Sequence, residues 1–316
     1  MRACGPQLCL AGQPYLIHGA TAYGAYGEPA GEIGLAESAG VNVLELVEFD
    51  TAHHVLGDVE SQATWERVDR FIAAAGSAHM HVVLNLSEYG QSLLAAGITP
   101  ATADWGGYLR FIAQRRNTVT GVLYREDPTI AMVELYGEID PPNAGPRPGV
   151  AGTTAQITAF FHRTLAQWHA LAPHILVSTG GFSYIGYPNS GIDWRRILRD
   201  PHNATCDIEV NSENDLNEGV PPFSSLCRHL GKPWFLAAWS ACYGDPSGGY
   251  NYYSSDSAMA QHVRAMYELA RGGSPAAGAA AGTDFWNLRE EPAVQGTCSI
   301  GRSFPLSLQA ARAGVP

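Results

Sequence analysis

The chain has 316 residues, a formal net charge of −11, 46% hydrophobic residues and 16% charged residues. This apolar content at modest charge density excludes a disordered chain, and no stretch approaches the roughly 20 uninterrupted apolar residues of a membrane span. The acidic balance, with Lys232 as the single lysine, disfavours nucleic acid and anionic lipid as partners. We therefore expect a soluble monomer that binds neither nucleic acid nor a membrane.

Apolar runs and amphipathic segments alternate along the chain. Strands are predicted over residues 15–21, 41–49, 81–86, 130–136, 175–179, 206–210, 234–238 and 279–286. Helices are predicted over residues 31–40, 63–78, 104–124, 154–171, 194–199, 222–230 and 257–271, and from residue 306 onward.

Eight strand-then-helix units predict parallel strands with right-handed crossovers, and eight of them predict closure into a (β/α)8 barrel of the TIM type. An open doubly wound sheet is the alternative. It is disfavoured because the segment His18-Gly-Ala-Thr21 lacks a glycine-rich phosphate loop. With no composition break or linker, we expect one domain over residues 1–316, with a short N-terminal hairpin over residues 1–14.

The cysteine pattern bears on the compartment. The six cysteines are Cys4, Cys9, Cys206, Cys227, Cys242 and Cys298. None forms a CxxC pair and none has zinc-ligand spacing, so up to three disulfides in a secreted protein are favoured over buried free thiols. Asn203-Ala-Thr205 is a glycosylation sequon, and Met1 is followed by no apolar signal region. We expect secretion, with the leader already removed.

Carboxylates and aromatic rings collect where the predicted strands end, which is where a barrel of this kind builds its site. The acids are Glu45, Glu48, Asp50, Glu88, Glu138, Asp140, Glu213, Asp215 and Asp284, and the rings are Tyr23, Tyr26, Tyr89, Tyr136, Tyr184, Trp239, Tyr243 and Trp286. Paired carboxylates beside flat rings are typical of sugar hydrolysis. The alternative is that acidic strand ends only face solvent.

One segment carries a family resemblance. The run Arg125-Glu-Asp-Pro-Thr-Ile-Ala-Met-Val-Glu-Leu-Tyr-Gly-Glu138 resembles the segment before the acid/base of glycoside hydrolase family 5, in particular its β-mannanase branch. Supporting stretches are LAGQPYLIHGATAYG from Leu10, WERVDRFIAAAGSAHMHVVLNL from Trp65, KPWFLAAWSACYG from Lys232 and GTDFW from Gly282. The resemblance covers most of the chain at low identity and implies a (β/α)8 barrel that acts on a β-linked glycan.

The resemblance implies roles at two positions and departs from the family pattern at five. Glu138 matches the general acid/base, and Trp286 matches the ring that floors the subsite at the cleavage point. The family nucleophile, a Glu on the seventh strand, is replaced here by Ala238. The other replaced positions are Gly137 for the Asn before the acid/base, Glu45 for a supporting Arg, and Ser212 and Asn214 for a His and a Tyr.

Three explanations for Ala238 are open. Ala238 is an engineered knockout of a Glu; or another carboxylate (Glu45, Glu88 or Glu213) serves as base or nucleophile beside Glu138; or the barrel has lost catalysis and only binds a glycan. Glu45 argues against the first, because a carboxylate where a supporting Arg is expected would repel a nucleophilic Glu.

The prediction is thus a glycoside hydrolase whose partner is an oligo- or polysaccharide, either mannan-like or containing amino sugars. The expected substrate-binding residues are Trp286, Tyr136, Trp239, Tyr243, Asp284, Glu48 and Asn211. We expect no cofactor and no metal, since the adjacent His53 and His54 would point opposite ways in an extended segment and have no third ligand at regular spacing.

Overall fold

The computed structural model describes residues 1–23, 29–47, 62–187, 189–272 and 278–314. Its centre is a sheet of eight parallel strands in the order β8-β7-β6-β5-β4-β13-β10-β9. In chain order these strands are β4 (Ile17–Tyr23), β5 (Val43–Val47), β6 (His81–Asn85), β7 (Ile130–Glu134), β8 (Leu176–Ser178), β9 (Cys206–Val210), β10 (Trp234–Trp239) and β13 (Gly282–Phe285).

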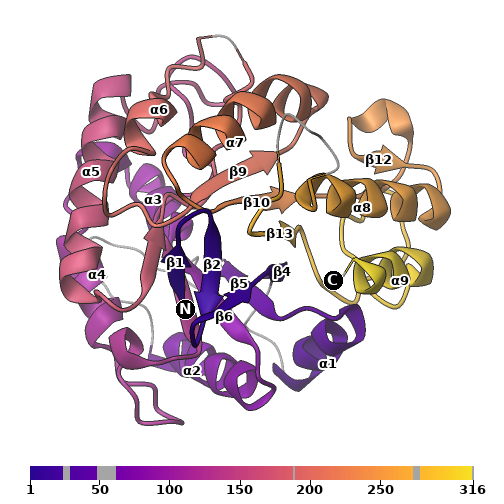
Figure 1. Cartoon of the computed structure of the whole chain (residues 1–316), viewed down its shortest axis with the longest axis horizontal. Helices are drawn as coiled ribbons and strands as arrows, with labels where there is room; N and C mark the ends of the chain where they lie inside the picture. The colour runs from indigo at the N-terminus through magenta and orange to yellow at the C-terminus, as the bar shows by residue number, and fades with distance from the viewer. Residues whose placement is uncertain (24–28, 48–61, 188, 273–277, 315–316) are drawn as a thin grey trace.

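The two edges of this sheet meet just beyond β8. Phe182 forms a parallel bridge with Ile208, through backbone bonds of 3.2 Å from Phe182 N to Asp207 O and from Glu209 N to Phe182 O. Helices surround the strands (Figure 1): α1 (Pro29–Ala39), α2 (Gln62–Ser77), α3 (Ser87–Ala95), α4 (Gly106–Gln114), α5 (Thr154–Leu171), α6 (Trp194–Ile197), α7 (Val220–His229), α8 (Asp256–Ala270) and α9 (Pro305–Ala313). The predicted (β/α)8 barrel is confirmed.

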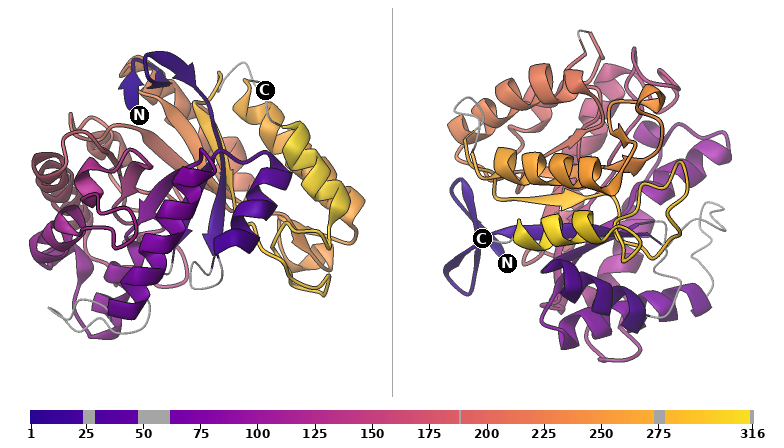
Figure 2. Two further views of the ribbon diagram at one scale, coloured as in Figure 1. Left: turned by 90° about the horizontal axis from the view of Figure 1, so that it is seen from below. Right: turned by 90° about the vertical axis from the view of Figure 1, so that its right-hand side faces the viewer.

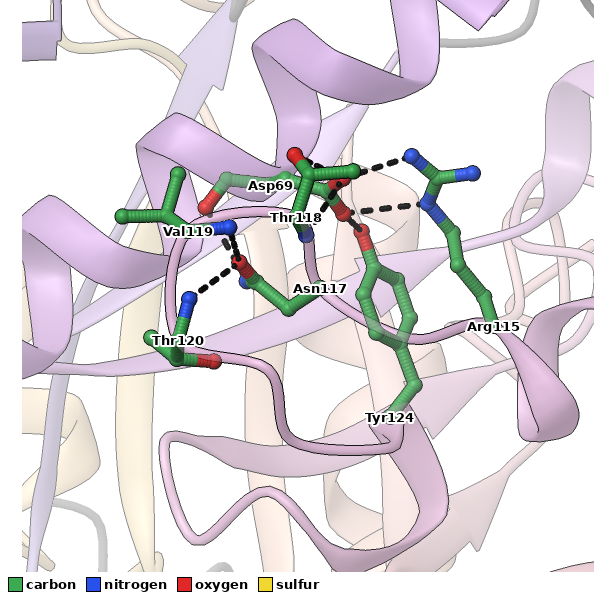
Figure 3. A network of polar contacts seen from close by, with 7 residues as sticks. All are labelled: Asp69, Arg115, Asn117, Thr118, Val119, Thr120 and Tyr124. Atoms are coloured by element: carbon green, nitrogen blue, oxygen red, sulfur yellow. Dashed lines mark hydrogen bonds and ion pairs between the residues drawn. The ribbon is translucent and has the colours of Figure 1, made fainter.

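The sequence located most elements, but it missed helix α3 and extended one helix too far. The predicted bounds of β9 and α5 agree with the structure, whereas the helix predicted over residues 104–124 ends at Gln114. Beyond it, Arg115 pairs with Asp69 of α2, and the Asn117 side chain accepts from the backbone N–H groups of Val119 and Thr120 (Figure 3). These bonds form a turn in place of further helix.

The N-terminal segment forms a small antiparallel sheet of β1 (Arg2–Cys4), β2 (Gln7–Leu10) and β3 (Gln13–Tyr15). It lies at the end of the barrel where β4 begins (Figure 2). Leu8 is fully buried there and belongs to an apolar cluster with Val43, Val83 and Met132 from the barrel strands. The small sheet therefore closes the amino end of the barrel and leaves the opposite end for a site.

The barrel interior changes character along its axis. Alternate residues of each strand face inward in a barrel. The first inward positions are apolar, as with Val43 of β5 and Met132 of β7, and the next ones on the same strands are the acids Glu45 and Glu134. The polar layer therefore faces the carboxyl ends of the strands.

The cysteine prediction is confirmed in part. Cys4 pairs with Cys9 and Cys242 with Cys298, whereas Cys206 and Cys227 are free and buried, so a third bridge is absent from the described residues. Both free cysteines belong to the apolar core, which accommodates thiols as small hydrophobic side chains. Within the described ranges, no helix is both long enough and apolar enough to cross a membrane.

Candidate active site

A cavity of about 660 Å³ opens at the carboxyl ends of the strands. Its described lining includes four carboxylates, Glu45, Glu88, Glu138 and Glu209, and no Lys, Arg or His. The remaining described lining residues are Val47, Asn85, Ser87, Gln91, Gly137, Gly180, Asn211, Ala237, Ala238, Ser240, Cys242, Asn251, Tyr252, Trp286 and Cys298. This acidic lining favours neutral or cationic ligands over anionic ones.

Glu138 is the exposed carboxylate of this cavity, and its backbone is unusual. It follows β7 with φ at 53°, in the left-handed region that non-glycine residues seldom adopt. Its amide N–H donates to the carbonyl of Gly181 at 3.3 Å, which fixes this conformation. Residues held in such conformations cluster at functional sites. The backbone geometry therefore supports the sequence-based prediction that Glu138 is a functional residue.

A second carboxylate, Glu209 of β9, lies beside Glu138. Asn211 Nδ2 donates to Glu138 Oε1 at 3.2 Å and to Glu209 Oε2 at 3.3 Å, and Ser183 Oγ also donates to Glu209 Oε2. Burial, followed by the nearby Glu138 carboxylate, raises the pKa of Glu209 well above its ordinary value. Glu209 therefore holds its proton to higher pH than an ordinary glutamate does.

A second pair of acids, Glu45 and Glu134, lies deeper in the barrel. Asn85 Nδ2 donates to Glu45 Oε1 at 2.6 Å and to Glu134 Oε2 at 3.3 Å, while Thr21 Oγ1 donates to Glu45 Oε2 at 2.7 Å. Burial raises the pKa of Glu45, and burial together with the Glu45 charge raises the pKa of Glu134 well above its ordinary value. Glu134 is therefore the protonated member, and it donates to Glu45.

Steric contacts explain one departure from the family pattern. A Cβ added to Gly137 would lie 2.1 Å from the carbonyl oxygen of Gly180, so an asparagine cannot occupy this position without backbone movement. At Ala238 the side chain is half-buried at the cavity wall, and its Cα is the register partner of Glu209 on the neighbouring strand. A glutamate at 238 would therefore enter beside an existing carboxylate.

The structure brings six of the sequence-predicted site residues to the cavity: Glu138, Glu45, Glu88, Ala238, Asn211 and Trp286. Trp286 is held by a backbone bond from its N–H to the Trp239 carbonyl at 2.7 Å. Which of these residues takes part in catalysis or substrate binding stays a prediction.

The other predicted site residues do not line the cavity, and their packing or exposure shows where they lie instead. Tyr136 packs over Gly90 in the core, Trp239 is 1% exposed and donates to Thr283 Oγ1 at 2.6 Å, and Asp284 is buried beside Thr21. Tyr243 packs against Phe304, and Glu213 is exposed. None of these five is among the described lining residues, and Glu48 lies outside the described residues.

Sequence reasoning missed Glu209 and Asn85, which lie within strands and not after them. A signal was present at Glu209. Asp207 and Glu209 alternate along β9, and a spacing of two residues points both inward in a barrel strand.

The described residues contain no group of three or more His, Cys, Asp or Glu side chains arranged to hold a metal ion. His53 and His54, which the sequence raised as a metal candidate, lie outside the described residues.

Comparisons with known proteins place this geometry in context. No family model matches the chain, and no curated protein matches it. Solved structures do. The endo-1,4-β-mannanase of Rhizomucor miehei aligns with a TM-score of 0.76 at 17% identity, over 99% of this chain and 98% of that one.

Two further structures extend the similarity. A glycoside hydrolase family 5 mannosidase of Rhizomucor miehei aligns with a TM-score of 0.70 at 16% identity, covering 98% of this chain and 95% of that one. The catalytic domain of the major endoglucanase of Xanthomonas campestris pv. campestris aligns with a TM-score of 0.60 at 16% identity over 100% of both chains. The chain has the (β/α)8 fold of these glycoside hydrolases. Identities this low establish the fold alone, so the chemistry has to be argued from the residues of the site.

Proposed function

We propose that the protein is a glycoside hydrolase that cleaves a β-linked glycan, with Glu138 as general acid/base. The observation that carries this proposal is the placement of Glu138, at the carboxyl end of β7, exposed to the cavity and bridged by Asn211 to a second carboxylate. Glycoside hydrolysis requires one carboxyl group to protonate the leaving oxygen and another to act at the anomeric centre. The solved mannanase, mannosidase and endoglucanase structures that share the fold support the same substrate class.

The cavity wall suggests how a sugar is held. Trp286 and Tyr252 supply half-buried aromatic rings, and Asn211 and Gln91 supply side-chain amides. Flat rings stack on the apolar faces of pyranoses, and amides bond to hydroxyl groups. We therefore propose Trp286 and Asn211 as substrate contacts.

The excess of carboxylates favours one refinement of the substrate. With Glu45, Glu88, Glu138 and Glu209 in the described lining and no basic side chain among them, a protonated amino sugar would gain ion pairs that a mannan cannot. Chitosan binding should then weaken as salt rises from 0.05 to 0.5 M, while mannan binding stays level. A salt-independent chitosan affinity would eliminate this refinement.

The direct test is reducing-end release from mannan, β-glucan, xylan and chitosan. The wild-type chain should release product from at least one of them, and Glu138→Gln should abolish release while leaving the affinity for that polymer within about threefold, because the amide is isosteric but cannot transfer a proton. The matched control is Glu126→Gln, which changes an exposed acid just before β7 in the chain. It should retain activity. Full activity of Glu138→Gln would refute the proposal.

Ala238 favours a second candidate, a barrel that binds glycans without cleaving them. The family to which the sequence is similar carries its nucleophile at that position. Binding of a polymer by wild-type protein that releases no product would support this candidate. If Ala238→Glu then released product, the site would be a silenced nucleophile instead.

Secretion is part of the proposal. The Cys4–Cys9 and Cys242–Cys298 disulfides support it, because disulfides persist in oxidising compartments. An extracellular location also suits an enzyme whose substrate is a polysaccharide.

A further inference from the structure

Glu209 of β9 lies beside Ala238 of the adjacent strand β10. In the pairing of β9 with β10, the register shifts between Leu236 and Ala238, and Ala238 becomes the Cα partner of Glu209. Side chains at paired positions of adjacent parallel strands lie on the same face of the sheet. Both residues line the cavity. A carboxylate is therefore present one strand away from the position that the resembled family uses.

The surroundings of Glu209 hold its carboxyl group in place. A Cβ added to Gly181 would lie 2.8 Å from Glu209 Cγ and Oε1 and 3.2 Å from Ala237 Cβ, so the Glu209 carboxyl fills space that a glycine and an alanine leave open. Ser183 and Asn211 both donate to Oε2. These contacts fix the orientation of the carboxyl group, as a functional carboxylate requires.

The hydrogen bonds of Asn211 set an upper limit on the spacing between Glu209 and Glu138. Asn211 Nδ2 lies 3.2 Å from Glu138 Oε1 and 3.3 Å from Glu209 Oε2, so these oxygens cannot be further apart than the two distances laid end to end. That limit does not exceed the lower end of the about 6.5–9.5 Å that inverting enzymes keep, and it accommodates the about 5–5.5 Å of retaining ones.

The other acids are less well placed. Glu45 lies deeper, with both oxygens engaged by Asn85 and Thr21. Glu213 is exposed and is not among the described lining residues. Glu88 lines the cavity at the start of α3, on the β6 side of Glu138. Among the described carboxyl groups, Glu209 is the one that shares a hydrogen-bond donor with Glu138.

We propose that Glu209 is the nucleophile of the hydrolysis described above, an assignment that rests on the proposed function. A Glu209 oxygen bonds to the anomeric carbon while the bond from that carbon to the leaving oxygen breaks, and Glu138 gives its proton to that oxygen. Water then gives a proton to Glu138 and bonds to the anomeric carbon. The bond to Glu209 breaks, and the carboxylate is regenerated. Configuration is retained, since the carbon inverts twice.

Glu209 has to lose its proton before it can attack, because burial and the Glu138 carboxylate raise its pKa well above the ordinary value. The first step needs one protonated and one ionised carboxyl group. Both residues line one cavity whose other described acids are Glu45 and Glu88. When the sugar is bound, the proton is required on Glu138, the exposed member that faces the leaving oxygen.

Covalent trapping tests the assignment on the full wild-type chain. 2-Deoxy-2-fluoro-β-mannobiosyl fluoride and the β-cellobiosyl analogue form a glycosyl–enzyme ester that breaks down slowly, and peptide mass spectrometry locates it. We expect one disaccharide added to the peptide that contains Glu209. A label on Glu45, Glu88 or any other residue, or polysaccharide hydrolysis without a label, would overturn the assignment and leave the proposed function standing. Absence of both hydrolysis and label would refute the proposed function, and this assignment with it.

A variant provides a second readout. Glu209→Ala should lower kcat by at least about a thousandfold. Sodium azide should restore turnover of an activated dinitrophenyl β-glycoside and yield the α-glycosyl azide, because azide attacks the face that Glu209 vacates. Glu218→Ala, an exposed acid further along the same chain segment, is the matched control and should keep wild-type turnover without azide. Rescue that yields no α-azide would exclude Glu209 as the nucleophile.

Discussion

Two buried acids of this molecule, Asp69 and Glu134, have opposite surroundings. Asp69 of α2 accepts hydrogen bonds from the buried Arg115 at 3.0 and 2.6 Å, from Tyr124 at 2.6 Å and from Thr118 at 3.1 and 2.8 Å (Figure 3). Glu134 inside the barrel has Asn85 as a donor and Glu45 as an acidic neighbour.

The two settings move the pKa in opposite directions. Burial alone would raise the pKa of Asp69, but the bonds from Arg115, Tyr124 and Thr118 outweigh it and lower that pKa below its ordinary value. Burial and Glu45 raise the pKa of Glu134. A buried carboxylate with a full set of donors and a counter-charge joins elements of the fold. A cluster without a counter-charge costs stability, and its position beneath the cavity points to function as the reason for its presence.

The largest effect on stability should come from breaking the buried Asp69–Arg115 ion pair. Asp69→Asn leaves the Arg115 guanidinium, with a side chain only 7% exposed, without its counter-charge. Removing one partner of a buried ion pair costs about 3–5 kcal/mol, and urea unfolding should show a loss of that size. Glu126→Gln, which breaks the exposed Arg125–Glu126 pair, should change the unfolding free energy by less than about 0.5 kcal/mol. Equal losses in the two variants would remove the basis of the comparison.

An intermediate effect is expected from Asn85, the donor common to both barrel acids. Asn85→Ala deprives Glu45 and Glu134 of their shared amide. Leaving buried acceptors without a donor should lower the unfolding free energy by about 1–3 kcal/mol. Ser77→Ala, which removes an exposed bond to the Ala73 carbonyl, serves as control. A neutral Asn85→Ala variant would mean that the acids do not depend on this donor.

The smallest effect has the opposite sign. The raised pKa of Glu134 keeps it protonated in the folded state, so its contribution to stability is complete below its unfolded pKa and declines as pH rises toward the folded one. Glu134→Gln resembles the protonated acid and cannot ionise. The variant should match the wild type at pH 4 and become more stable than the wild type as the pH rises to 8. Thermal unfolding across this range measures the difference, and a difference that does not change with pH would contradict the raised pKa.

The fold could be predicted from the sequence because its signals are local. The five residues Cys206–Val210 are all buried, and the strand bounds follow from that apolar run despite two acids within it. The helical error at residues 115–124 arose because Arg115 contacts Asp69, 46 positions away in the chain, and no local pattern carries that contact.

The site was harder to predict because it depends on register. Glu138, Asn211 and Trp286 follow strand ends, and the sequence placed them at one rim. Glu209 lies within β9 and not at its end. That Ala238 is its neighbour follows only from the register of β9 and β10, which shifts between Leu236 and Ala238. The pairing of strands far apart in sequence thus decides which carboxylates meet.

We propose that Glu138 and Glu209 together cleave a β-linked glycan with retention of configuration. Proton NMR of the products, recorded in the first minutes before mutarotation, tests it most directly with whichever polymer of the panel is cleaved. We predict that the β-anomer of the new reducing end appears first and that the α-anomer grows in later. Initial appearance of the α-anomer would mean inversion, and would contradict the pairing of Glu138 with Glu209 as acid/base and nucleophile.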